Sequence, residues 1–166
     1  MNAIEIRRAT REDRPALQRM LELYQHDLSD IWDQDVDTDG LYGYVLDKYW
    51  SIDGCVPFVA TVGGRYAGFA LADGAVKVEA EVGSAGHWMD QFFVLKKYRR
   101  HGLGRHLARA VFDALPGNWE VGQMLGNLPA QHFWRALIAE YTQGQFTEHE
   151  LRGGRWEGFV QVFKRP

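Results

Sequence analysis

The sequence predicts an α/β protein of the α+β type, in which helices flank a mixed and mostly antiparallel central sheet. Strand-like and helix-like patterns follow one another over 166 residues in the order β-α-α-β-β-β-α-β-α-β-β. Paired glycines separate two pairs of neighbouring strand patterns, as they do in hairpins. This order gives about seven strands and about four helices packed around one core. We therefore expect residues 1–166 to form a single domain.

The first third of the chain combines one strand pattern with two helix patterns. Residues 4–8 alternate apolar and charged side chains, as a half-buried strand does. Thr10 and Asp13 are both candidate N-caps of the next helix, and Pro15 favours the later start because the first turn can spare its N–H. Residues 42–49 carry a second, shorter helix pattern.

Three strand patterns occupy the middle of the chain. Residues 56–62 and 65–72 are rich in β-branched and aromatic side chains, and the glycine pair between them predicts a hairpin. Residues 77–86 are small and polar enough to form a loop or a frayed edge of the sheet. Residues 88–95 form the clearest central strand, because aromatic side chains stand at positions of both faces.

The C-terminal half holds two more amphipathic helix patterns and three more strand patterns. They are a helix over residues 103–115, a strand over 119–124, a helix over 128–141, and a terminal hairpin of 146–151 with 156–163. Asn127 is a natural N-cap of the second helix, and Pro129 suits its first turn.

Composition narrows the class of function. The net charge is −3 and no long Lys/Arg run occurs, so we expect no nucleic-acid partner. No uncharged apolar run approaches the roughly 20 residues of a membrane span, and the first residues do not resemble a signal peptide. The single cysteine, Cys55, excludes an intrachain disulfide and disfavours a zinc cluster, so we expect no metal and a cytoplasmic location. Cys55 is expected to fill the core rather than to act as a nucleophile.

The segment with the clearest chemistry is Arg99-x-x-Gly102-x-Gly104, between a strand pattern and an amphipathic helix. The two glycines let the backbone pass close to a ligand, where any Cβ would intrude. The helix start directs N–H groups and the positive end of its dipole at the loop, which favours an anion such as a pyrophosphate. Further positive charge comes from Lys96, Lys97, Arg100 and His101. The alternative is an ordinary strand-to-helix turn with basic residues on a solvated loop.

Two common phosphate motifs do not fit this segment. The chain has no Gly-x-x-x-x-Gly-Lys-Ser/Thr run. Leu107 stands where the dinucleotide fingerprint needs its third glycine. The run from Arg99 to Gly104 instead resembles the Gln/Arg-x-x-Gly-x-Gly/Ala motif of the GNAT N-acetyltransferases.

A second motif further along the chain supports the same resemblance. Asn127-x-x-Ala130-x-x-Phe133-Trp134 is similar to the Asn-x-x-Ala-x-x-Phe-Tyr signature of that family. The resemblance covers nearly the whole order of elements, and it implies a GNAT-like fold.

The resemblance also implies acetyl-CoA as the co-substrate. The main chain at Phe92 and Val94 would pair with pantetheine, and a backbone N–H near Val94 would polarise the acetyl carbonyl. Backbone N–H groups of the glycine loop would hold the pyrophosphate. The residues implied in cofactor binding are Phe92, Val94, Arg99, Arg100, His101, Gly102, Leu103, Gly104 and Asn127.

In the resembling family the amine acceptor attacks directly, so it must first lose a proton. Asp90 is the best candidate for the base, because it lies on the central strand four residues before Val94, on the face that also carries Trp88. Asp90 could instead hold the acceptor ammonium. His87 is a lesser candidate, since strand alternation turns it to the opposite face. Asp90 and Val94 are thus the predicted catalytic residues.

Trp134 departs from the family pattern, in which a tyrosine at this position protonates the departing thiolate. The proton would then come from Tyr141, His132 or water. A thiol is acidic enough to leave with little help. The same departure leaves open a second function, that of a non-catalytic acyl-CoA-binding module with a regulatory or structural role.

The connection between the first two helix patterns is strongly acidic. In the resembling family this region walls the acceptor site, so it would attract a cationic acceptor such as a polyamine, a lysine side chain or an aminoglycoside. The alternative is a solvated acidic loop. The residues are Asp27, Asp30, Asp33, Asp35, Asp37 and Asp39.

Part of this connection also resembles a calcium loop. Asp35-x-Asp37-x-Asp39-Gly40 matches the first half of an EF-hand. Leu46 occupies the twelfth position, where the bidentate glutamate is required, so an EF-hand is excluded and a weak calcium site is the remaining alternative.

These patterns predict an acetyl-CoA-dependent N-acetyltransferase that acts on a primary amine of a small molecule or peptide. The sequence leaves the identity of the acceptor open, and an acyl donor longer than acetyl fits it as well. A homodimer is compatible with an apolar surface on the terminal hairpin.

Overall fold

The structure is a computed structural model that describes residues 2–78, 85–154 and 156–166. Within these residues the elements form a seven-stranded sheet in the order β1-β2-β3-β4-β5-β7-β6, together with three α-helices. The helices are α1 (Arg14–Trp32), α2 (Leu103–Ala114) and α3 (Leu128–Tyr141), and the strands are β1 (Ile4–Arg8), β2 (Val56–Val62), β3 (Arg65–Asp73), β4 (His87–Val94), β5 (Gly117–Gln123), β6 (Thr147–Leu151) and β7 (Gly158–Arg165). The mixed α/β fold class is therefore confirmed. None of the helices in the described ranges is long and apolar enough to cross a membrane.

The chain divides into two compact units, each with its own buried core. The first unit contains Met1–Leu71 and Gln91–Leu107, and the second contains Ala72–Asp90 and Ala108–Pro166. Strands β3 and β4 and helix α2 therefore contribute residues to both units.

In the first unit, α1 packs against the sheet through one apolar stripe. Leu17 and Leu21, one turn apart on the helix, are fully buried with Phe69 of β3. The ring of Tyr24 continues the stripe, with its centroid 5.9 Å from that of Phe69 and 5.5 Å from that of Phe93. Burial of each large apolar side chain contributes about 1.5–3 kcal/mol, so this stripe fixes α1 against the strands.

The hairpin of β2 and β3 is confirmed, and its turn explains the glycine pair. Gly63 and Gly64 have φ angles of 56° and 74°, so both lie in the left-handed region that a two-residue hairpin turn requires. Further along β3, a Cβ added at Gly68 would come within 2.5 Å of the carbonyl oxygen of Phe93. This close backbone approach fixes the end of β4 against β3.

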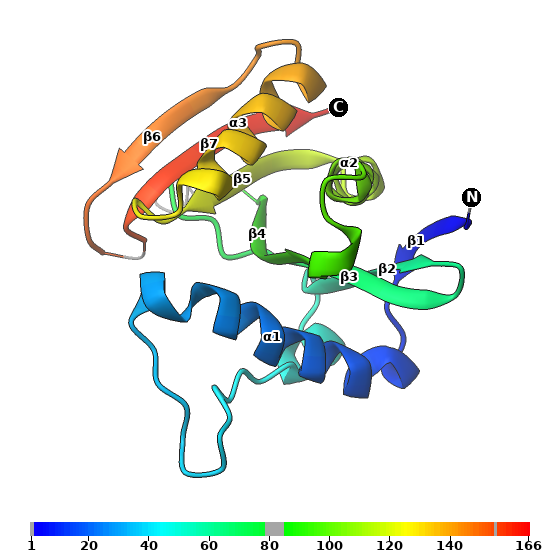
Figure 1. The fold of residues 1–166 in the computed structure, drawn as a ribbon. Helices are drawn as coiled ribbons and strands as arrows, with labels where there is room; N and C mark the ends of the chain where they lie inside the picture. Colours follow the sequence, from blue (N-terminus) through cyan, green and yellow to red (C-terminus); the bar gives the residue numbers. More distant parts are fainter. Residues whose placement is uncertain (1, 79–84, 155) are drawn as a thin grey trace. The chain divides into compact units, whose positions relative to one another are not determined.

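In the second unit, α3 packs on β5 and β7 (Figure 1). Its core centres on Phe112, whose ring lies 4.9 Å from that of Trp119 and 5.0 Å from that of Phe163. Gln123 and Gln161 are also buried here, and their side-chain amides exchange two hydrogen bonds of 2.6 and 2.9 Å. The pair is tolerated in the core because each amide satisfies the other.

The terminal hairpin buries some of its apolar residues and leaves Phe159 and Val162 half-buried. Val160 and Phe163 of β7 are buried, whereas β6 is exposed over Thr147, Glu148, His149 and Glu150.

The prediction of a helix over residues 42–49 was wrong, and with it the count of about four helices. This segment is an irregular connection that ends in a short 3-10 turn, Asp47–Trp50. The carboxylate of Glu22 on α1 accepts the backbone N–H groups of Tyr42 and Gly43 at 2.8 and 3.1 Å. Gly43 also has a left-handed φ of 80°. Tertiary hydrogen bonds thus replace the helical ones.

Other predicted elements are confirmed with shifted ends. The predicted strand over 88–95 is β4, and the helix capped by Asn127 is α3. The terminal strands begin one and two residues later than expected, at Thr147 and Gly158. Most of the loop expected over 77–86 lies outside the described residues.

Asp13 acts as the centre of a buried ion-pair network rather than as a simple helix cap. Its carboxylate accepts two hydrogen bonds from the Arg7 guanidinium at 2.7 and 2.9 Å, one from the Tyr66 hydroxyl at 2.7 Å and one from the Thr10 N–H at 2.7 Å. The hydrogen bonds from Arg7, above all, hold the pKa of this carboxyl well below its usual range. The network ties β1 and β3 to the start of α1.

We predict that Asp13→Asn lowers the free energy of unfolding at pH 7 by about 1–3 kcal/mol, because a buried partner of Arg7 loses its charge. The pKa of Asp13 is depressed in the folded state, so its contribution is present above the unfolded value near 4 and disappears as the pH falls toward the folded value. Urea unfolding of both proteins at pH 7 and pH 3 measures this difference, which should shrink at pH 3.

Asp47→Asn is the matched control, because it breaks the exposed ion pair with Arg14. Its cost should stay within about 1 kcal/mol. An equal cost for the two variants at pH 7 would show that the Asp13 network does not stabilise the fold.

Candidate functional site

Strand β4 presents the predicted catalytic residues along one face. Asp90, Phe92 and Val94 are half-buried, whereas the intervening Gln91 and Phe93 are buried. Because side chains alternate along a strand, the three half-buried residues belong to the same face. Asp90 is the last residue of β4 in the second unit, whereas Phe92 and Val94 belong to the first unit.

Arg99 binds the end of β4 with its side chain. Its Nε donates to the carbonyl oxygen of Val94 at 2.7 Å, and its guanidinium forms an ion pair with Asp27 of α1. The guanidinium also lies over the ring of Phe93, 5.3 Å from the ring centroid. The side chain of Arg99 is thus directed at the strand and α1, which leaves its backbone for the predicted contact with pyrophosphate.

The loop after Arg99 contains two residues in the left-handed region. Arg100 has a φ of 65° and Gly102 a φ of 81°. A positive φ at a non-glycine residue is uncommon and costs about 1–3 kcal/mol, which is typical of functional loops. Turns of this kind bring successive N–H groups to one side, where they can bind an anion.

Helix α2 begins directly after this loop. The first intrahelical hydrogen bond runs from the N–H of His106 to the carbonyl oxygen of Gly102 at 3.1 Å. The N–H groups of Leu103 and Gly104 therefore belong to the helix end, where no helical acceptor is in reach. The helix dipole adds positive potential at this end. Exposed cationic side chains surround it, namely Lys96, Lys97, Arg100 and His101.

Asn127 belongs to the second unit and caps α3. Its Oδ1 accepts the N–H of Ala130 at 3.3 Å. Gln131 supports the same turn, because its Nε2 donates to the carbonyl oxygens of Met124 and Leu125 at 2.9 Å each. The side-chain oxygen of Asn127 thus has a structural partner, and a cofactor contact would have to use its other groups.

Sequence reasoning missed Glu120, a buried acid in the second unit. Glu120 of β5 lies opposite Trp88 of β4 in a parallel pair, and both side chains are buried. Oε1 of Glu120 accepts the N–H groups of Lys77 and Val78 at 2.6 and 2.8 Å. The signal was a single charge in the apolar run Trp119-Glu120-Val121.

Trp156 was also missed, although it packs beside the same strand face. Its ring lies 5.1 Å from that of Trp88 at an interplanar angle of 70°. Gly122 of β5 makes room for both rings, since a Cβ there would collide with Cη2 of Trp88 and lie 3.0 Å from Nε1 of Trp156. A lone glycine inside a strand pattern was the available signal.

His87 has a partner of its own. Its Nε2 lies 3.0 Å from the carbonyl oxygen of Pro116, and its ring lies 5.0 Å from that of Trp119. These contacts give His87 a structural role at the start of β4.

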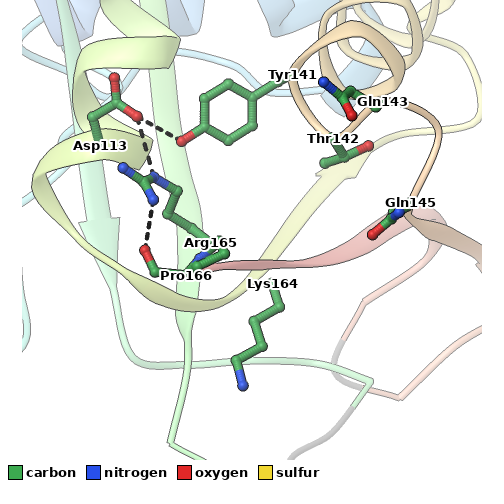
Figure 2. A pocket seen from close by; sticks show the side chains of 8 residues that line it. All are labelled: Asp113, Tyr141, Thr142, Gln143, Gln145, Lys164, Arg165 and Pro166. Carbon is green, nitrogen blue, oxygen red and sulfur yellow. Dashed lines mark hydrogen bonds and ion pairs between the residues drawn. The ribbon is translucent and has the colours of Figure 1, made fainter.

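Tyr141, one of the predicted proton donors, lies in a polar pocket of about 410 Å³ in the second unit. Figure 2 shows its hydroxyl directed at Asp113, to which it donates at 2.7 Å, while Nε of Arg165 donates to the same oxygen at 3.2 Å. Burial first, and then the bond to Asp113, raise the pKa of Tyr141 to about 12. Trp134 is buried and His132 is exposed. The proton of Tyr141 is therefore engaged within the pocket.

In the acidic connection, one carboxylate accepts hydrogen bonds from backbone N–H groups of the same segment. Oδ1 of Asp37 accepts the N–H groups of Asp39 and Leu41 at 2.8 and 3.0 Å. Leu46, the twelfth position of the calcium-loop pattern, is fully buried in the core of the first unit. Within the described ranges, no group of three or more His, Cys, Asp or Glu residues could hold a metal ion. Cys55 is half-buried against the same core.

The glycine loop, the helix that it opens and the capped α3 correspond to a known family. A family model described as the acetyltransferase (GNAT) family matches residues 17–137. The chain belongs to the GNAT family. Members of this family are N-acetyltransferases, so the chain is an acyltransferase.

Solved structures with related folds agree. An acetyltransferase of Thermus thermophilus is 18% identical, with a TM-score of 0.69 and 99% of each chain covered. YncA of Salmonella typhimurium, solved with its cofactor acetyl-CoA, is 20% identical, with a TM-score of 0.62 over 98% of this chain and 94% of that chain. The ribosomal-protein-S18-alanine N-acetyltransferase of Escherichia coli is 18% identical, with a TM-score of 0.58 over 96% of this chain and 91% of that chain. No curated protein matches the sequence.

We predict that Tyr141→Phe leaves the rate of acetyl transfer unchanged and lowers the free energy of unfolding by about 0.5–1.5 kcal/mol, because it removes one hydrogen bond to Asp113. Steady-state kinetics with a panel of amines and urea unfolding measure the two effects. His132→Gln is the companion variant, since His132 is the other side chain considered as a proton donor. A loss of kcat of about 100-fold or more in Tyr141→Phe would instead identify it as the general acid.

Proposed function

We propose that this GNAT protein is an acetyl-CoA-dependent enzyme that transfers an acetyl group to a primary amine by direct attack. The observation that carries the proposal is the loop with left-handed φ angles at Arg100 and Gly102, which leads into the N-terminus of α2. Such a loop gathers N–H groups and positive potential, and both are what a pyrophosphate needs.

The donor side of the site would use the first unit. N–H groups from Arg99 to Gly104 would bind the pyrophosphate, and the main chain at Phe92 and Val94 would align the pantetheine arm. The N–H near Val94 would stabilise the oxyanion, and one such donor lowers the barrier by about 3–4 kcal/mol. YncA was solved with acetyl-CoA, and the PaiA N-acetyltransferase of Thermoplasma acidophilum, 14% identical, was solved with coenzyme A. Both support this choice of co-substrate.

The acceptor side would use Asp90 as the general base. Asp90 is half-buried on β4, so its carboxylate could accept a proton from an amine bound at this strand. Glu120 is a less suitable base, because its side chain is fully buried, whereas that of Asp90 is half-buried. Water would supply the proton to the departing thiolate.

Charge favours a cationic acceptor, either a small molecule or a peptide. The exposed carboxylates of the connection after α1 would concentrate positive ligands near the first unit. These residues are Asp33, Asp35 and Asp39, and the exposed Asp30 precedes them in the last turn of α1. A cytoplasmic location and a homodimer stay predictions.

We predict that saturating acetyl-CoA raises the thermal unfolding midpoint of the protein and that Gly102→Val abolishes this rise. Ligand at about 100 times its dissociation constant adds roughly 2.7 kcal/mol, or about 2–4 °C for a chain of this size. Valine at a φ of 81° would distort the loop that binds the pyrophosphate.

Gly144→Val is the matched control, because Gly144 has a φ of 80° and no atom within 4 Å of an added Cβ. This variant should be destabilised but should keep the acetyl-CoA shift. Absence of any shift in the wild-type protein would refute acetyl-CoA as the co-substrate.

We predict that Asp90→Asn lowers kcat by about 10²–10⁴-fold, because the base is lost, while the acetyl-CoA shift remains. Asp53→Asn, in an exposed turn, is the control and should keep full activity. Initial rates with a panel of primary amines provide the measurement. An unchanged kcat would exclude Asp90 as the base, and acetyl-CoA binding without transfer to any amine would support the non-catalytic module.

A further inference from the structure

Trp156 carries a polar atom that lacks a partner. The indole ring is half-buried, whereas its Nε1 is buried and has no hydrogen-bond acceptor in the described part of the chain. A buried N–H without an acceptor costs about 1–3 kcal/mol, so most such groups are satisfied by water or a ligand. The indole N–H therefore points to a missing acceptor atom.

The position of this N–H is fixed by packing. The ring of Trp156 contacts that of Trp88 at 5.1 Å, and both rings lie over Gly122, where even a Cβ would collide with them. Lys77 covers the ring of Trp88, with Nζ 4.9 Å from the centroid. A donor held in this way offers a hydrogen bond of defined direction at little cost in side-chain entropy.

The ring of Trp156 packs against Trp88, on the strand that also carries Asp90. Trp88, in contact with Trp156, precedes Asp90 by two residues on β4. The Cα atoms of two such residues lie roughly 6.6 Å apart along a strand. A small molecule with one hydrogen bond of about 2.9 Å at each end covers such a distance. An amine held at Asp90 would therefore place an oxygen two or three bonds away near Trp156.

We propose that Trp156 is a specificity-determining residue whose indole N–H donates a hydrogen bond to an oxygen of the acceptor. The substrate class is then a primary amine with a carbonyl or carboxylate oxygen close to the amine, as in an amino-acid amide or a peptide N-terminus. This inference rests on the proposed transfer to an amine at Asp90, and it adds the group that distinguishes one amine from another.

Glycinamide and ethylamine test the inference, because they differ in the carboxamide that would accept the hydrogen bond. The wild-type enzyme should have the higher kcat/KM for glycinamide. Trp156→Phe should raise KM for glycinamide by about 2–10-fold, as expected for one neutral hydrogen bond, and leave the kinetics of ethylamine unchanged. Comparing the ratio of the two amines between variants cancels their different basicity.

Two further variants separate specificity from packing. Trp156→His, which keeps a ring N–H, should restore part of the preference for glycinamide. Trp50→Phe removes a half-buried indole from the first unit and should leave the preference intact. The acetyl-CoA shift of the unfolding midpoint should be the same in all these proteins.

Several outcomes would overturn the inference. The first is that the wild-type enzyme does not acetylate glycinamide. The second is that Trp156→Phe keeps the wild-type ratio of kcat/KM for glycinamide to that for ethylamine. The third is that Trp156→Phe lowers kcat/KM equally for both amines. In each case a retained acetyl-CoA shift and activity on other amines would leave the proposed function standing. Loss of the shift in the wild-type protein would instead refute the proposed function itself.

Discussion

The contact of Arg99 with the end of β4 is the constraint on which the donor side depends. One guanidinium binds the carbonyl oxygen of Val94, pairs with Asp27 and covers Phe93. Charged hydrogen bonds of this kind are worth more than neutral ones, so they offset the strain of the left-handed Arg100 that follows. The strand end, α1 and the loop from Arg99 to Gly104 are thereby held as one part of the first unit.

In the second unit, hydrogen bonds and space decide which groups are available for chemistry. Glu120 is the more buried carboxylate, yet its Oε1 is occupied by the N–H groups of Lys77 and Val78. Gly122 provides the space in which Trp88 and Trp156 meet, so the rings lie beside the strand rather than apart from it. In this unit Glu120 therefore holds the backbone at Lys77 and Val78. The packing of Trp156 against Trp88 fixes the position of the indole N–H.

The sequence predicted most elements because their signals are local. The stripe of α1, the hairpin turn at Gly63 and Gly64, and the cap at Asn127 each depend on neighbours within one or two turns. The helix expected over residues 42–49 failed for the opposite reason. Its apolar spacing was helical, but Glu22 on α1 supplies acceptors to the backbone, and no local pattern reveals such a partner. The role of Tyr141 as a proton donor was similarly ambiguous in the sequence, because its hydrogen-bond partner, Asp113, lies 28 residues away along the chain.

By itself the sequence determined the family and the fold class, because the motif from Arg99 to Gly104, the motif from Asn127 to Trp134 and the order of the elements are local patterns. Only the tertiary structure decided which polar groups are already satisfied and which are left for a ligand. The partners of Glu120 and Trp156 lie far away in the chain: the N–H of Lys77 donates to Glu120, and the ring of Trp88 packs against Trp156. Hydrogen-bond satisfaction is a property of three-dimensional neighbours, so spacing along the chain does not reveal it.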